Sequence, residues 1–178
     1  MAHDILIVDD EADIRMLIAG VLKDEGFATR EAADSTQALA AIQVRQPTLV
    51  VLDIWLQNSE FDGIEILQKL RADMPTVPVV MISGHGTIET AVEAIKIGAY
   101  DFIEKPFKAD RLLLLVARAI EAAQLRRENA ELKALLLTAQ ERLLDMLKMD
   151  DGQAFSEADK FSKRLTEYLN RDKRIDVV

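Results

Sequence analysis

The stretch that decides the fold is Thr48-Leu49-Val50-Val51-Leu52-Asp53, an apolar run of strand length that ends in a carboxylate. Residues 5–8 form a similar run, and Asp9 and Asp10 follow it directly. Continuous apolar runs of this length are typical of strands that are buried on both faces of a parallel sheet. Because parallel strands end at the same edge, the sequence predicts that these carboxylates lie close together.

The rest of the first two thirds of the chain alternates apolar runs with segments of helical period, which is the pattern of β-α-β units. Glycines and prolines mark the boundaries between them. The pattern predicts an open, doubly wound α/β sheet. The expected strands are 4–8, 27–31, 48–52, 78–82 and 100–103, and the expected helices between them are 11–25, 34–45, 62–73 and 87–97.

Composition limits the class of protein. The 178 residues are 49% apolar and 30% charged, which favours a packed core over disorder. The absence of cysteine excludes disulfides and thiolate metal sites and fits a reducing compartment. The net charge of −9 argues against a general nucleic-acid binder. No apolar run has the length of a membrane span and the first residues lack a basic signal-peptide start, so we expect a cytoplasmic protein without a membrane partner.

Four predicted strand ends carry reactive or charged groups, namely Asp9 with Asp10, Asp53, Ser83 and Lys105. Ligands of open α/β sheets bind beyond these ends. Mg²⁺ takes oxygen ligands, and phosphoryl transfer needs a nucleophile and neutralised charge. Each residue alone has a plainer explanation, such as a helix cap or a turn. Their conjunction favours a Mg²⁺ site beside a phosphorylated Asp53, with Lys105 and Ser83 bound to phosphoryl oxygens.

These residues resemble the response-regulator receiver domains of two-component signalling over about residues 3–122. The matching pieces are Asp9-Asp10, Val51-Leu52-Asp53, Ile82-Ser83-Gly84 and Lys105-Pro106-Phe107. Three stretches, 52–57, 82–86 and 100–111, are similar to the NtrX-type nitrogen-regulation branch. The resemblance implies a flavodoxin-like, five-stranded parallel sheet of order 2-1-3-4-5, here with an extended C-terminal helix and a short extra helix.

The resemblance also implies roles for residues of the pocket. Asp53 is then phosphorylated by a partner sensor histidine kinase, and Mg²⁺ is held by Asp10, Asp53 and the backbone carbonyl of Trp55, with Asp9 bound through water. Such a protein is not an enzyme beyond weak self-dephosphorylation. A cis peptide bond between Lys105 and Pro106 is a further expectation from the family.

Ser83 and Phe102 correspond to the switch residues of the family, which alter the surface formed by helix 87–97, strand 100–103 and the helix that follows. Trp55 and His85 correspond to positions that set the lifetime of the acyl phosphate. The alternatives are a permanently buried Phe102, an exposed His85 and a Trp55 that only covers a loop.

The segment between Asp53 and the next helix departs from the family pattern. Gln57 stands where most receivers have a proline, and residues 57–61 form a longer connection than usual. We expect a mobile loop there.

Residues 109–149 contain no glycine or proline and predict one long helix. It carries a heptad seam with alternating g and e charges, as in a parallel dimeric coiled coil. The seam residues are Ala122, Leu125, Asn129, Leu132, Leu136 and Leu143. The alternative is a helix that packs only on its own chain. A last helix at about 156–170 is expected to fold back on it. The predicted organisation is thus a receiver at 1–122, a helical extension at 123–149 and a turn with an amphipathic helix at 150–178.

Two rival functions are weighed against a phosphorylation switch. A phosphatase of the haloacid-dehalogenase kind needs a second aspartate where Trp55 stands. The other rival is a dimeric interaction protein with a vestigial pocket. NtrX-type regulators also carry an ATPase domain and a DNA-binding domain, and neither pattern occurs here, so direct nucleic-acid binding by this chain is not expected. A shortened regulator, a fragment and a fusion all fit, and the kinase and the effector stay open.

Overall fold

A computed structural model describes residues 3–84, 86–148, 159–160, 162–164 and 166–167. The predictions for His85 and for most of residues 150–178 lie outside the described residues. The chain forms two compact units, Met1–Gln124 and Leu125–Val178, which are described separately.

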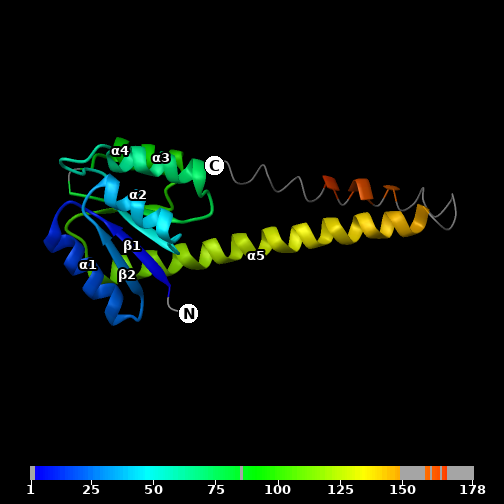
Figure 1. Cartoon of the computed structure of the whole chain (residues 1–178), viewed down its shortest axis with the longest axis horizontal. Helices are drawn as coiled ribbons and strands as arrows, with labels where there is room; N and C mark the ends of the chain where they lie inside the picture. Colours follow the sequence, from blue (N-terminus) through cyan, green and yellow to red (C-terminus); the bar gives the residue numbers. More distant parts are fainter. Residues whose placement is uncertain (1–2, 85, 149–158, 161, 165, 168–178) are drawn as a thin grey trace. The chain divides into compact units, whose positions relative to one another are not determined.

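The first unit is built on one parallel sheet of five strands (Figure 1). Its order is β2-β1-β3-β4-β5, which confirms the predicted topology. Every strand lies within one residue of its expected bounds, and fully buried runs, largely apolar, set three of the five, β1, β3 and β4. The strands are β1 (Asp4–Val8), β2 (Ala28–Ala32), β3 (Leu49–Asp53), β4 (Val79–Ser83) and β5 (Asp101–Glu104).

Three of the helices, α2, α3 and α4, begin at residues whose side chains satisfy a free backbone N–H. Asp34 caps α2 and Thr87 caps α4, each by accepting a backbone N–H through its side chain. Asp62 and Glu65 form a capping box on α3, and Gly98 ends α4 with a left-handed φ of 117°. The helices are α1 (Ala12–Asp24), α2 (Ser35–Val44), α3 (Gly63–Asp73), α4 (Ile88–Ile97) and α5 (Ala109–Lys148).

Two apolar clusters cover the two faces of the sheet. Alternate residues of β1 supply them: Leu6 and Val8 face α2, α3 and α4, whereas Ile5 and Ile7 face α1 and the first turns of α5. All four are fully buried, and each contributes about 1.5–3 kcal/mol relative to exposure. The central strands are thus fixed on both sides, which holds their carboxyl ends in register.

An ion cluster fixes the amino-terminal edge of the same sheet. The Asp4 carboxylate accepts hydrogen bonds from both Nε and Nη2 of Arg30, the latter at 2.8 Å, and lies 3.0 Å from Nη2 of Arg45. Arg30 also donates to the backbone carbonyls of Ala41 and Arg45. The cluster therefore joins β1, β2 and the end of α2.

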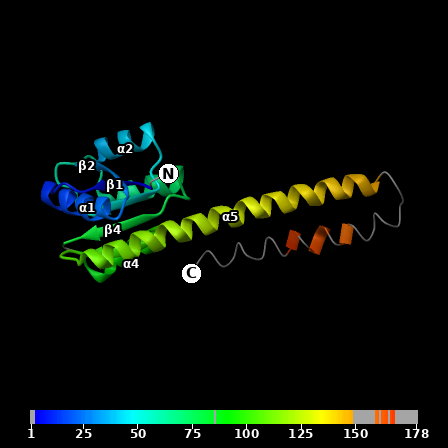
Figure 2. The same cartoon turned by 90° about the horizontal axis from the view of Figure 1, so that it is seen from below.

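In the second unit, the described residues between 159 and 167 are helical and pack beside α5 (Figure 2). Among the described residues, polar groups make this contact. Gln140 of α5 is 9% exposed, and its Nε2 donates to the carbonyl of Ser162 at 2.9 Å and to the hydroxyls of Ser162 and Thr166. The described residues of this segment therefore lie against α5. Within the described part of the chain, no helix is long and apolar enough to cross a membrane.

Candidate functional site

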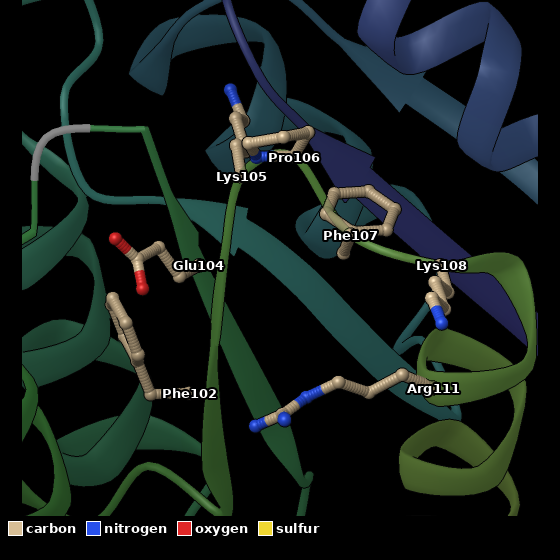
Figure 3. Close-up of a pocket in the computed structure, with 7 residues that line it drawn as sticks. All are labelled: Phe102, Glu104, Lys105, Pro106, Phe107, Lys108 and Arg111. Atoms are coloured by element: carbon tan, nitrogen blue, oxygen red, sulfur yellow. The ribbon is translucent and has the colours of Figure 1, made fainter.

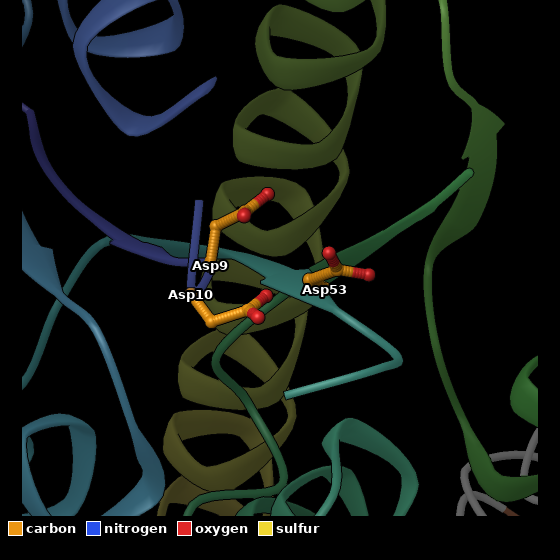
Figure 4. Close-up of side chains that lie close together, drawn as sticks. All are labelled: Asp9, Asp10 and Asp53. Carbon is orange, nitrogen blue, oxygen red and sulfur yellow. The ribbon is translucent and has the colours of Figure 1, made fainter. Parts of the chain in front are cut away.

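Three carboxylates meet at the carboxyl edge of the sheet, those of Asp9, Asp10 and Asp53 (Figure 4). Each offers an oxygen within 4.8 Å of the other two. Val8 of β1 pairs with Leu52 of β3, so Asp9 and Asp53, which directly follow these residues, lie at the same level. Asp9 is fully buried and Asp53 is 3% exposed. The structure thus brings together the acids that the sequence placed at strand ends.

Lys105, just beyond β5, is the cation of this site. Its Nζ lies 2.7 Å from Oδ2 of Asp53, 2.8 Å from Oδ2 of Asp9 and 3.1 Å from Oε1 of Glu11. Its backbone N–H donates to the carbonyl of Ser83 at 2.8 Å, which attaches the lysine to the end of β4. The Lys105–Pro106 peptide bond is cis. One ammonium group is therefore shared by two buried carboxylates and one exposed carboxylate.

The charges of the site are unbalanced. Burial raises the pKa of both Asp9 and Asp53, although hydrogen bonds from Lys105 act against this. For Lys105, burial lowers the pKa, but the hydrogen bonds to Asp53 and Asp9 outweigh it and the net shift is upward. The lysine is therefore charged at neutral pH. A single positive charge among several carboxylates leaves an excess of negative charge, which favours binding of a divalent cation.

Two neighbours of the acidic pair were missed by the sequence analysis. Nη1 of Arg15 donates to the carbonyls of Asp9 and Asp10, at 2.6 and 3.1 Å, and so fixes the backbone of the pair. The N–H of Glu11 donates to Oδ1 of Asp9 at 2.9 Å, in addition to the contact of Glu11 with Lys105. The only sequence signal for the role of Arg15 was its position one turn into α1.

Comparison with known proteins agrees with this geometry. Residues 5–117 match the family model of the response regulator receiver domain. The chain belongs to this family. It is 63% identical over 135 residues to the nitrogen assimilation regulatory protein NtrX of Azorhizobium caulinodans, covering 76% of this chain and 30% of that protein. It is 57% identical over 134 residues to a putative NtrX-like response regulator of Rickettsia bellii, covering 75% and 28%.

Solved structures of receiver domains also match this chain. The receiver domain of NtrX from Brucella abortus matches with a TM-score of 0.65 and 64% identity, covering 66% of this chain and 98% of that one. A beryllofluoride-activated NtrC4 receiver domain dimer matches with a TM-score of 0.64 and 36% identity, covering 67% and 98%. The resemblance to NtrX-type receivers is thus confirmed. The chain spans about a third or less of the length of the curated relatives named above.

Ser83 and Phe102, the predicted switch residues of the receiver domain, lie on neighbouring strands. Ser83 ends β4 and is fully buried, whereas Phe102 of β5 is partly buried. A cavity of about 520 Å³ lies beside β5, lined in part by Phe102, Lys105 and Arg111 (Figure 3). In the same view the Lys105 side chain points away from the Phe102 ring. A Cβ on Gly86 would lie 2.6 Å from the ring, so the ring occupies space that only glycine leaves open.

Trp55 lies at the rim of the receiver pocket. Its side chain is 52% exposed, and its backbone N–H donates to Oδ1 of Asp53 at 3.2 Å. The predicted partner in setting the phosphate lifetime, His85, lies outside the described residues.

The predicted dimer seam lies on α5. Four of its leucines are 49–61% exposed in the single chain: Leu125, Leu132, Leu136 and Leu143. Asn129 is also exposed, and Ala122 is partly buried. The helical segment that contains Ser162 contacts α5 through Gln140, and it leaves these four leucines uncovered.

Proposed function

We propose that Asp53 accepts a phosphoryl group from a partner sensor histidine kinase in the presence of Mg²⁺. The observation that supports this most strongly is the set of three carboxylates with oxygens within 4.8 Å of one another, with Lys105 at 2.7 Å from Asp53. In the transfer, the bond from phosphorus to the histidine nitrogen breaks and a bond to a carboxylate oxygen of Asp53 forms. The imidazole leaves with the electron pair of the broken bond.

The donor set fits Mg²⁺. The ion prefers carboxylate and carbonyl oxygens, keeps several waters and needs no thiolate or imidazole. Asp10, Asp53 and the backbone carbonyl of Trp55 would hold it, with Asp9 bound through water. When bound, it neutralises charge on the transferred group. Lys105 and the Ser83 hydroxyl then act on phosphoryl oxygens, the first by charge and the second by hydrogen bonding.

The output of the switch is proposed to be the surface of α4, β5 and the start of α5. Ser83 ends β4 beside β5, and Phe102 sits between Gly86 and the cavity at Lys105 and Arg111. New bonds from the phosphoryl group to Ser83 and Lys105 would bias the packing of Phe102 and so alter this surface. The Trp55 side chain is proposed to shield the acyl phosphate from water, with His85 modulating water access.

The α5 seam is proposed to pair two copies of the chain as a parallel coiled coil. The exposed leucines of the seam give the apolar stripe, and Glu121 and Glu128 stand at g positions. Arg126 and Lys133 stand at the e positions five residues later, so both pairs between chains are of opposite sign. Phosphorylation would then change the geometry of the dimer. We propose residues 1–122 as the receiver and residues 123–149 as the paired extension, acting in the cytoplasm.

Phosphorylation of the whole chain by acetyl phosphate, followed by intact mass measurement, tests the primary proposal. We expect one added phosphoryl group with Mg²⁺, none with a chelator, and none on Asp53→Asn. An unmodified wild-type protein would favour the rival function, an interaction protein with a vestigial pocket. The half-life of the label in Trp55→Ala tests the shield, because an unchanged half-life removes that role.

The dimer is tested by molar mass in solution. Leu132→Ser removes a seam leucine and is expected to give monomers, whereas Leu137→Ser lies outside the seam and is expected to leave the dimer intact. A wild-type monomer at micromolar concentration would contradict the proposal. Repeating the measurement with beryllofluoride shows whether the acyl phosphate state changes the dimer.

A further inference from the structure

The connection between β3 and α3, residues 54–62, forms one wall of the acidic pocket. The backbone N–H of Trp55 donates to Asp53, and the N–H of Gln57 donates to Oδ2 of Asp10 at 3.4 Å. The Trp55 carbonyl proposed as a metal ligand lies between these two contacts in the chain. The position of this short piece of backbone therefore decides how the carboxylates and the carbonyl face a bound cation.

Two serines tie this wall to α2. The N–H of Ser35 donates to Oγ of Ser59 at 2.9 Å, and Oγ of Ser35 accepts the N–H of Phe61 at 3.2 Å. The Ser59 hydroxyl in turn donates to the carbonyl of Phe61 at 2.8 Å. Ser35 is 1% exposed, so its polar groups depend on protein partners.

The start of α2 explains why Ser59 is needed there. The first amides of a helix have no acceptor within the helix, and among them the Asp34 side chain accepts the backbone N–H of Gln37. Ser59, from a segment 24 residues away, supplies the acceptor for Ser35. The tie thus stabilises the helix end and the wall at the same time.

The segment that forms this wall is short, and contacts fix it at both ends. Asn58 adopts a left-handed φ of 55°, which turns the chain between Gln57 and Ser59. Beyond Ser59, Phe61 packs against the apolar core, and Lys69 lies 4.1 Å from the centre of its ring. This longer connection makes hydrogen bonds to Asp10 and to α2.

We propose that Ser35 and Ser59 are positioning residues for the divalent cation, because their hydrogen bonds hold the Trp55–Gln57 backbone against the acidic pocket. Neither side chain touches the cation. This inference rests on the proposed function, since it concerns the same Mg²⁺ site. Groups that orient metal ligands from behind change metal affinity when they are removed, typically by a factor of 10 or more.

The inference is tested by titrating the whole chain with Mg²⁺. Binding is detected by calorimetry and by the fluorescence of Trp55, the only tryptophan of the sequence. We expect Ser59→Ala to weaken Mg²⁺ binding about tenfold and Ser35→Ala to weaken it as well. Ser59→Thr keeps the hydroxyl and is expected to restore the affinity. Glu60→Gln changes an exposed neighbour in the same segment and is the matched control.

The outcomes separate this inference from the proposed function. If the wild type does not bind Mg²⁺, the proposed function fails. If the wild type binds and Ser59→Ala binds equally well, only the role of the serines is overturned. A loss that Ser59→Thr does not restore, or one that Glu60→Gln shares, also overturns it. Urea unfolding of each variant without Mg²⁺ shows whether a loss of affinity is merely a loss of fold, which would count against positioning.

Discussion

Replacing Gly63 with alanine is expected to disturb the fold and the metal site together. Gly63 is the first residue of α3, and its N–H donates to the carbonyl of Ile54 at 2.8 Å. A Cβ at this position would lie 2.0 Å from the carbonyl oxygen of Asp53 and 2.8 Å from the Cα of Ile54. Both neighbours are backbone atoms of the segment that carries Asp53, the proposed phosphoacceptor, so no side-chain rotation relieves the overlap.

The size of the effect follows from that distance. Real Cβ contacts are essentially never shorter than 3.0 Å, so the backbone has to separate by at least about 1 Å. Overpacking of this kind costs about 1–3 kcal/mol. Since about 1 kcal/mol shifts the melting temperature of a chain of this length by about 2–4 °C, we expect a fall of several degrees.

Urea unfolding, together with Mg²⁺ titration, measures both consequences of Gly63→Ala. The Asp53 carbonyl is the atom displaced, so Mg²⁺ affinity should fall along with the free energy of unfolding. The control is Gly20→Ala in α1, where a Cβ meets no atom within 4 Å. That helix-interior change should stabilise by about 0.5–1 kcal/mol. A Gly63→Ala protein as stable as Gly20→Ala would refute the reasoning.

Three further predictions concern charge. Asp53→Asn should raise the free energy of unfolding at neutral pH without Mg²⁺, because burial raises the pKa of Asp53 above 3.8 and folding then favours its neutral form. The wild type loses stability as pH rises through the folded-state pKa of Asp53. Urea unfolding should therefore show that the gain in free energy of unfolding from Asp53→Asn disappears in acid. Lys105→Met leaves Asp9 and Asp53 without their cation and should cost about 3 kcal/mol without Mg²⁺; unchanged stability would contradict the shared ion pair. Asp4→Asn leaves the Arg30 guanidinium without its carboxylate and should lower the melting temperature, with Mg²⁺ affinity unchanged.

The sheet and most of the acidic pocket were predictable because each depends on local sequence. Apolar runs fixed three strands, β1, β3 and β4, and parallel strand ends brought Asp53 and the acidic pair to one edge. β2 was the weakest prediction, since its residues are partly exposed and its position depends on pairing with β1.

The contacts that the sequence did not reveal are formed between segments that lie far apart in the chain. Glu11 and Lys105 are 94 residues apart, and nothing in the local pattern of either one indicates that they meet. Ser35 and Ser59 look like ordinary cap and loop residues until the fold brings them together. Gly63 likewise resembles any glycine after a helix cap, whereas its necessity comes from the Asp53 backbone 2.0 Å from its missing Cβ.

The strand order has a consequence for local opening. Asp9, Asp53 and Ser83 lie at the ends of β1, β3 and β4, which are the three interior strands of the sheet. Releasing any of these three strands breaks two ladders of hydrogen bonds. The backbone amides of the strands should therefore exchange with solvent only through near-global unfolding.

β5 is different because it is an edge strand of four residues paired only with β4. Phe102 lies on β5, so the proposed output surface can open at a lower free energy than the interior strand ends that carry Asp9 and Asp53. Substitutions on β5 should therefore change the free energy of local opening at the proposed output surface, while the opening of the strand that carries Asp53 stays close to global unfolding.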